Sequence, residues 1–203
     1  MGWYARHILP RLIEGGCSQP PLMRLREQYV PRARGRVLEV GVGTGLNLRY
    51  YDGDVELTAL DPAAELTAKA RERAASRGMN VELLGVSGEM IPADDARFDA
   101  LVCTWTLCTI PDPARALAEM HRVVRPGGAL YFIEHGLSPE AGVARWQHRI
   151  EPLWKRIAGG CHLSREADKL IAAAGFEISE RMAEQLPGPK IATWVTHGVA
   201  LRA

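Results

Sequence analysis

Three glycines at alternate positions most constrain how this chain can fold. The stretch Glu39–Gly45 reads EVGVGTG and continues a short β-branched run that begins at Val37. Glycines at a strand-to-helix turn allow a tight bend and a close approach of the backbone to a ligand. A dinucleotide loop is the usual rival interpretation, but Leu46 stands where GxGxxG needs its third glycine. Glu39 would repel a pyrophosphate, whereas it suits a cofactor with an amino group and a sulfonium.

Strand and helix patterns alternate along most of the chain. A helix-compatible stretch follows Leu46, and the Ala- and Glu-rich residues 63–77 predict a helix that stops at Gly78. Pro113 sits near the start of another helix. Strands are predicted at residues 37–40, 55–60, 81–86, 98–104, 129–133, 176–181 and 191–201. This alternation predicts one α/β domain over residues 1–203, with a parallel sheet flanked by helices.

Other helices are predicted outside this repeat. Residues 3–14 and 22–29 read as two short helices, broken by Gly15-Gly16 and Pro20-Pro21. Residues 140–158 read as an additional helix, whose Trp146 and Trp154 lie on one face and are expected to pack on the sheet. Ser164 is a plausible N-cap for a helix that extends to Ala174. Residues 1–34 are interpreted as a helical lid and residues 137–162 as an insertion that covers an acceptor pocket.

Composition argues against some partners. The net charge is +1, whereas a nucleic-acid-binding surface usually shows a strong basic excess. No run approaches the roughly 18 apolar residues of a membrane span, and no signal peptide is visible. We therefore expect a cytoplasmic protein with reduced cysteines. Five arginines near the N-terminus indicate either a solvated face or a docking surface for anionic lipid, so peripheral membrane contact stays open: Arg24, Arg26, Arg32, Arg34 and Arg36. The oligomeric state is not indicated.

Polar residues follow several predicted strands. Asp61 ends the second strand about 20 residues after the glycine loop, where a carboxylate can accept both ribose hydroxyls, and it can also cap a helix at Pro62. Residues 87–89, Ser-Gly-Glu, follow the third strand and are placed to line an adenine. Thr104 ends the fourth strand.

In combination these motifs resemble the class I S-adenosylmethionine (SAM)-dependent methyltransferases. The resemblance covers residues 35–181 through VLEVGVGTG, TALDP, FDALVCTWTL and VVRPGGALYFIEHG. It implies SAM as cofactor and a Rossmann-like, seven-stranded, mostly parallel sheet with a reversed final hairpin. It places Asp61 and Pro62 at the ribose and Thr104 near the methyl group. The methionine part would be surrounded by Glu39, Gly41, Gly43 and Gly45, and the adenine by Ser87, Gly88 and Glu89. Many relatives carry an acidic residue in place of Ser87, so the adenine contact there is expected to use backbone groups.

The acceptor side is less constrained. Methyl transfer from a sulfonium needs an aligned nucleophile and no metal. His135, His162 and His7 are candidate catalytic bases. Cys108 is interpreted as a small apolar filler. No metal site is expected, because Cys161-His162 has no ligand partner close by in the sequence.

A second resemblance bears on the acceptor. Residues 102–108, Glu134-His135 and residues 160–166 resemble the animal microsomal alkyl-thiol S-methyltransferases and their bacterial relatives. The glycine loop also resembles that of bacterial phosphatidylethanolamine N-methyltransferases. A small-molecule acceptor is therefore expected, with a thiol favoured over a phospholipid or small amine. A non-catalytic SAM-binding subunit and a nicotinamide-dependent oxidoreductase are less favoured interpretations.

Overall fold

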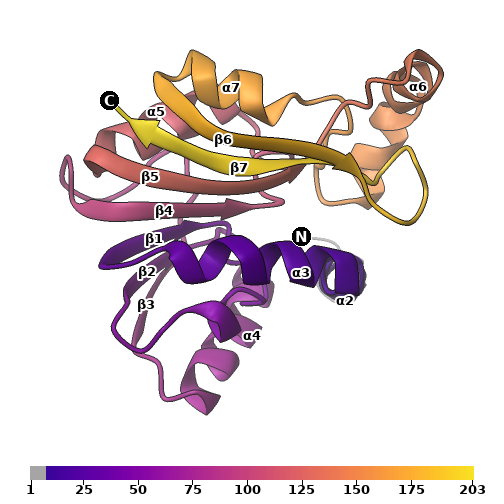
Figure 1. Ribbon diagram of the computed structural model, residues 1–203. Helices are drawn as coiled ribbons and strands as arrows, with labels where there is room; N and C mark the ends of the chain where they lie inside the picture. Colours follow the sequence, from indigo (N-terminus) through magenta and orange to yellow (C-terminus); the bar gives the residue numbers. More distant parts are fainter. Residues whose placement is uncertain (1–7) are drawn as a thin grey trace.

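A seven-stranded sheet forms the centre of the protein (Figure 1). The structure, a computed structural model, describes residues 8–203. The strands are β1 (Arg36–Val40), β2 (Glu56–Leu60), β3 (Val81–Leu84), β4 (Phe98–Thr104), β5 (Val124–His135), β6 (Phe176–Gln185) and β7 (Trp194–Arg202). Their order is β3-β2-β1-β4-β5-β7-β6, and only the pairs that involve β7 are antiparallel. The expected mostly parallel sheet with a reversed final hairpin is confirmed.

Helices cover both faces of this sheet, as the alternating pattern predicts. The α-helices of residues 8–203 are α2 (Leu9–Cys17), α3 (Pro20–Tyr29), α4 (Ala64–Ser76), α5 (Pro113–Val123), α6 (Ala141–Ile157) and α7 (Ala167–Ala173). Apolar residues of α5 and α7 share one core cluster on one face, whereas α4 and α3 contribute to two clusters on the other. Helix α6 stands apart near the end of the β6–β7 hairpin (Figure 1). No helix among residues 8–203 is long and apolar enough to cross a bilayer.

Some local predictions were wrong, each for a physical reason. Helix α2 continues through Gly15-Gly16, since a glycine lowers helix stability by only about 1 kcal/mol. After the glycine loop the chain forms only the short 3-10 helix Leu48–Tyr50, because Tyr51 leaves the helical region and bonds elsewhere. Ser164 does not cap α7; its backbone N–H and hydroxyl both donate to Glu151.

Trp146 also departs from expectation. Its side chain is 58% exposed and lies beside Arg149, so it does not pack on the sheet. Trp154 on the same helix is half-buried and donates its indole N–H to Cys161. The eight-residue spacing places both rings on one side of the helix. It does not indicate that the turn with Trp154 contacts Cys161 while the turn with Trp146 is exposed to solvent.

The strand register brings three loops to one edge of the sheet. Val40 pairs with Cys103, and Thr104 pairs with Ile133. The carboxyl ends of β1, β4 and β5 therefore lie side by side, and the loops that follow them meet there. Ligands of open α/β sheets bind at this edge.

Gly41 sets how closely two of these loops approach. Its φ is +78°, and an added Cβ would lie 2.2 Å from Oγ1 of Thr106. Gly43 also has a positive φ, +54°, but no atom lies within 4 Å of its hypothetical Cβ. The two glycines thus share the backbone requirement and differ in the available space.

We expect Gly41→Ala to reduce the free energy of unfolding by about 2–4 kcal/mol, because backbone strain and overpacking add. Gly43→Ala, the matched control, should cost about 1–2 kcal/mol from backbone strain alone. Urea unfolding measures both. Equal losses would show that the close approach of Gly41 to Thr106 does not matter for stability.

Candidate cofactor and acceptor site

Glu39 is the buried centre of the first half of the site. It is the penultimate residue of β1 and is buried, and its Oε1 accepts from the Asn47 side chain while its Oε2 accepts from the Tyr51 hydroxyl, both at 2.9 Å. Burial raises the pKa of Glu39 to about 7, although these hydrogen bonds oppose the shift. The charge of Arg26 also lowers this pKa, and a ligand ammonium group would add a directly bonded cation.

Arg26 of α3 reaches the same network. Its side chain is 4% exposed, and its Nη1 donates to Oδ1 of Asn47 at 2.6 Å and to Oγ1 of Thr104 at 2.8 Å. The guanidinium lies 4.6 Å from the ring centroid of Trp105, and Nε has no hydrogen-bond partner among residues 8–203. The arginines around it in the sequence suggested a solvated basic face, but Arg26 is buried and does not belong to one.

This arginine offers a counter-charge for a ligand carboxylate. Burial lowers the pKa of Arg26, so the guanidinium gains from an added anion. It lies beside Thr104, and both it and Glu39 bond to Asn47. An ammonium on Glu39 and a carboxylate on Arg26 together match the methionine part of SAM. No local pattern indicated this role, since Arg26 stands in an ordinary polar helix.

Asp61 links the glycine loop to the next helix. Its Oδ2 accepts from the backbone N–H of Gly43 at 2.9 Å, and its Oδ1 accepts from that of Ala63 at 2.8 Å. The expected helix N-cap role is wrong, because α4 begins at Ala64 with Ala63 as its N-cap, and at the start of this helix Asp61 bonds only to the backbone of that N-cap residue. Each carboxylate oxygen retains a lone pair for a ligand, so the expected ribose contact stays a prediction. Burial raises its pKa. Pro62 beside it is exposed.

The loop after β3 lies at the same edge. Ser87 donates its hydroxyl to Oε2 of Glu89 at 3.1 Å, and Oε1 of Glu89 accepts from the backbone of Asp112 at the start of α5. Gly88 is tightly placed, since an added Cβ would lie 2.9 Å from Val40. These residues form an ordered turn, and their expected contact with adenine stays a prediction.

Glu134 organises the second half of the site. This fully buried residue of β5 accepts from the backbone N–H groups of Thr106 and Leu107 at 2.7 and 2.9 Å, and from that of Cys108 at 3.4 Å. Burial raises its pKa to about 7, against the effect of these donors. The carboxylate thus fixes the loop after β4 next to the end of β5.

Three potential nucleophiles or ligands gather beside this loop. The sulfurs of Cys108 and Cys161 and a ring nitrogen of His135 all lie within 4.8 Å of one another. Nε2 of His135 lies 2.8 Å from the Cys161 sulfur, and Trp154 donates to that sulfur at 3.3 Å. They come from three separate places in the chain: the loop after β4, the end of β5 and the turn after α6.

Electrostatics favour a charged pair here. A hydrogen bond from the Cys108 thiol, with those from His135 and Trp154, lowers the pKa of Cys161 to about 4 although burial opposes this. Burial disfavours the imidazolium form of His135, but Cys161 raises its pKa overall. Nδ1 of His135 has no partner among the described residues. Both pKa shifts favour a Cys161 thiolate beside a His135 imidazolium.

The other two histidines predicted to be catalytic are placed differently. Nδ1 of His162 lies 3.1 Å from the carbonyl oxygen of Cys108, and the backbone N–H of His162 donates to the same oxygen. His162 therefore anchors the turn after α6 to the loop after β4. His7 lies outside the described residues. Among the histidines of residues 8–203, His135 alone joins Cys108 and Cys161.

Comparison with known proteins shows the family to which this chain belongs. Residues 38–132 match the family model described as "Methyltransferase domain". The chain is 37% identical to the thiol S-methyltransferase TMT1B of Rattus norvegicus, over 75% of this chain and 64% of that protein. It is also 37% identical to the phosphatidylethanolamine N-methyltransferase of Cereibacter sphaeroides, over 88% of this chain and 87% of that protein. The match thus spans just under two thirds of the thiol S-methyltransferase's length.

Solved structures agree at the level of the fold. A SAM-dependent methyltransferase of Thermotoga maritima, described as a possible histamine N-methyltransferase, superposes with a TM-score of 0.66 at 22% identity. The match covers 98% of this chain and all of that one. The [4+2]-cyclase SpnF matches with a TM-score of 0.69 at 23% identity, over 90% of this chain and 80% of its own. This architecture therefore serves more than one chemistry.

The role assigned to Arg26 can be tested with a ligand that lacks the carboxylate. We expect Arg26→Met to weaken SAM binding by about 10–100-fold, as for the loss of a charged hydrogen bond. Decarboxylated SAM should bind the variant and the unchanged protein about equally. Calorimetric titration measures both affinities, with circular dichroism as the folding control. Equal losses for the two ligands would mean that Arg26 shapes the pocket without binding the carboxylate.

Proposed function

Since the chain belongs to the family of SAM-dependent methyltransferases, we propose that it transfers a methyl group from S-adenosylmethionine to a small-molecule thiol. The observation that carries this choice of acceptor is the Cys161–His135 pair, which lies at the carboxyl edge of the sheet, where β5 ends. The similarity to the thiol S-methyltransferases supports the same choice.

The donor side follows from the charges at the sheet edge. In this proposal Glu39 binds the ammonium group and Arg26 the carboxylate of the cofactor. Asp61 accepts from the ribose hydroxyls, with Pro62 beside it, and residues 87–89 line the adenine. Thr104, next to Arg26, then faces the sulfonium region. Gly41, Gly43 and Gly45 let the backbone pass close to the methionine part.

The acceptor must react as a thiolate. Its sulfur forms a bond to the methyl carbon while the bond from that carbon to the sulfonium breaks, and the electron pair stays on S-adenosylhomocysteine. The acceptor proton goes to solvent before attack. The positive charge of the His135 imidazolium would favour the thiolate form of the acceptor, because the Nδ1–H of His135 has no other partner among the described residues. His135 then acts by its charge, and His162 holds the loop that carries Cys108.

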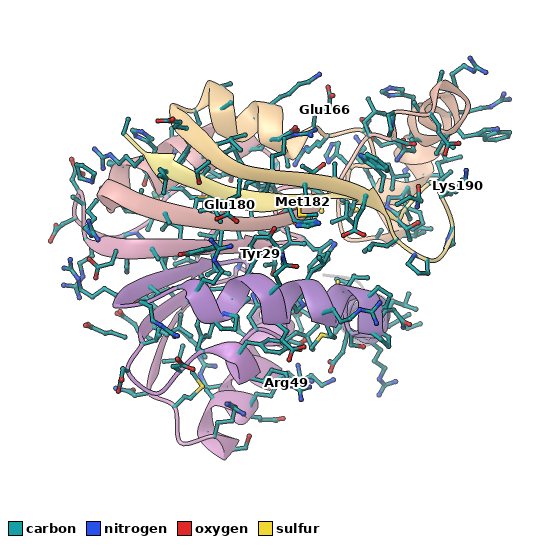
Figure 2. All side chains as sticks on the ribbon, viewed as in Figure 1. Tyr29, Arg49, Glu166, Glu180, Met182 and Lys190 are labelled. Atoms are coloured by element: carbon teal, nitrogen blue, oxygen red, sulfur yellow. The ribbon has the colours of Figure 1, made fainter. Side chains whose placement is uncertain are left out.

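A phospholipid amine is the second candidate acceptor, favoured by the similarity to the phosphatidylethanolamine N-methyltransferase. The arginines that suggested a lipid surface are largely engaged elsewhere. Arg32 forms an ion pair with Glu180 on β6, labelled in Figure 2. Arg34 pairs with Asp52 and Arg36 with Asp99, and Arg26 is buried. Paired arginines offer little net charge to an anionic membrane, so the thiol is preferred.

An acceptor panel tests this proposal. Release of S-adenosylhomocysteine is measured with alkyl and aryl thiols, hydrogen sulfide, small amines and phosphatidylethanolamine vesicles. We expect turnover with the thiols only. Asp61→Ala, purified in the same way, should release little product and so exclude a contaminating enzyme. Turnover confined to the vesicles would overturn the thiol proposal in favour of lipid N-methylation.

A further inference from the structure

The cluster of Cys108, His135 and Cys161 has the composition of a metal site. Two sulfurs and one imidazole nitrogen within 4.8 Å of one another form a Cys2His set. Zn²⁺ is bound by these ligand types, with three protein ligands and one open position where it takes part in chemistry. The sequence predicted no metal because Cys161-His162 had no partners nearby; the structure brings in Cys108 and His135 instead.

Three features prepare this cluster for a soft cation. Cys108 and Cys161 are buried and half-buried His135 joins them, so the ligands are shielded from competing water. Glu134 and His162 fix the loop of Cys108 from two sides. His135 presents Nε2 to the Cys161 sulfur, so the ring is already oriented. Ligands held in place lose less entropy on binding.

The net charge of the surroundings also suits a cation. Glu134 accepts from the backbone N–H of Cys108 at 3.4 Å and directly precedes His135 in the chain, so an acidic side chain lies next to two of the three ligands. Arg165 is a nearby basic residue, but its Nη1 is engaged with the backbone carbonyl of Ile110 at 2.6 Å. On metal binding, Cys108 and Cys161 would both be thiolates, and their two negative charges would balance a divalent cation.

We propose that Cys108, His135 and Cys161 bind a thiophilic divalent cation such as Zn²⁺, with a fourth position left open. Binding itself does not depend on the identity of the methyl acceptor. One consequence rests on the proposed function: a thiol coordinated at the open position is deprotonated outright. With the metal bound, His135 would be a neutral ligand, and the metal would supply the positive charge that the imidazolium supplies in the metal-free protein.

Cobalt substitution gives a direct readout. The full chain is stripped with a chelator and titrated with Co²⁺ in the absence of SAM and acceptor. We expect one equivalent to produce a sulfur-to-cobalt charge-transfer band and the intense visible bands of a tetrahedral site. Zn²⁺ should then abolish these bands by displacing the cobalt.

Matched cysteine variants identify the ligands. Cys161→Ser and Cys108→Ser should each lose most of the charge-transfer intensity, and His135→Gln should weaken Co²⁺ binding at least 10-fold. Cys17→Ser, which removes a thiol outside the cluster, should keep the bands. SAM binding, measured calorimetrically, checks that each variant is folded.

Two results would overturn the proposal. One is the absence of a charge-transfer band in the unchanged protein at one equivalent of Co²⁺; the other is an undiminished band in Cys161→Ser. Because no acceptor is present, neither result bears on whether the enzyme methylates thiols. Conversely, a failed acceptor panel would leave the metal measurement intact.

Discussion

The site depends on one buried carboxylate, that of Glu134. It accepts backbone hydrogen bonds from three consecutive residues, 106–108, and thereby holds the loop after β4 against the end of β5. Thr106 in this loop packs against Gly41, and Cys108 faces Cys161. His135 follows Glu134 directly in the chain. Glu134 thus connects the glycine loop, through Thr106, with the cluster of Cys108, His135 and Cys161, and His162 holds the same loop from the other side.

The part of the site proposed to bind SAM is likewise held together by buried hydrogen bonds, here among several polar side chains. Glu39, Asn47, Arg26 and Thr104 form one buried hydrogen-bond network that crosses from α3 to the ends of β1 and β4. Buried polar groups need partners, and a network with an unpaired Nε on Arg26 is incomplete among the described residues. In the proposed function a zwitterionic ligand would complete this network, because its ammonium and its carboxylate would each meet an oppositely charged side chain. These contacts would orient the methyl donor.

Part of this arrangement could be predicted from the sequence. Glu39, Asp61, Thr104 and His135 lie at or just beyond the carboxyl ends of predicted strands, and such ends of parallel strands meet at one edge. Local pattern and topology therefore predicted that these residues share one edge of the sheet, and the structure has them there. Arg26 could not be found this way, because its role depends on how α3 docks across the sheet. The contact of Cys108 with Cys161 needs the turn after α6 to return to the loop after β4, which no local pattern encodes. The prediction that Trp146 packs on the sheet was wrong for a similar reason, since helical spacing does not indicate which turn of a helix contacts the rest of the protein.

In the proposed site, the most important contact is that between Glu39 and the ammonium group of SAM. With a pKa of about 7 in the free protein, Glu39 is about half protonated at pH 7. An ammonium partner lowers this pKa, so binding should release about half a proton at that pH. Calorimetric titration of SAM in buffers of different ionisation enthalpy measures the release, and Glu39→Gln removes this contribution while leaving any titration of the ligand itself. If Glu39 binds the ammonium group, the unchanged protein should release about half a proton more per SAM bound than Glu39→Gln does. Equal values for the two proteins would contradict it.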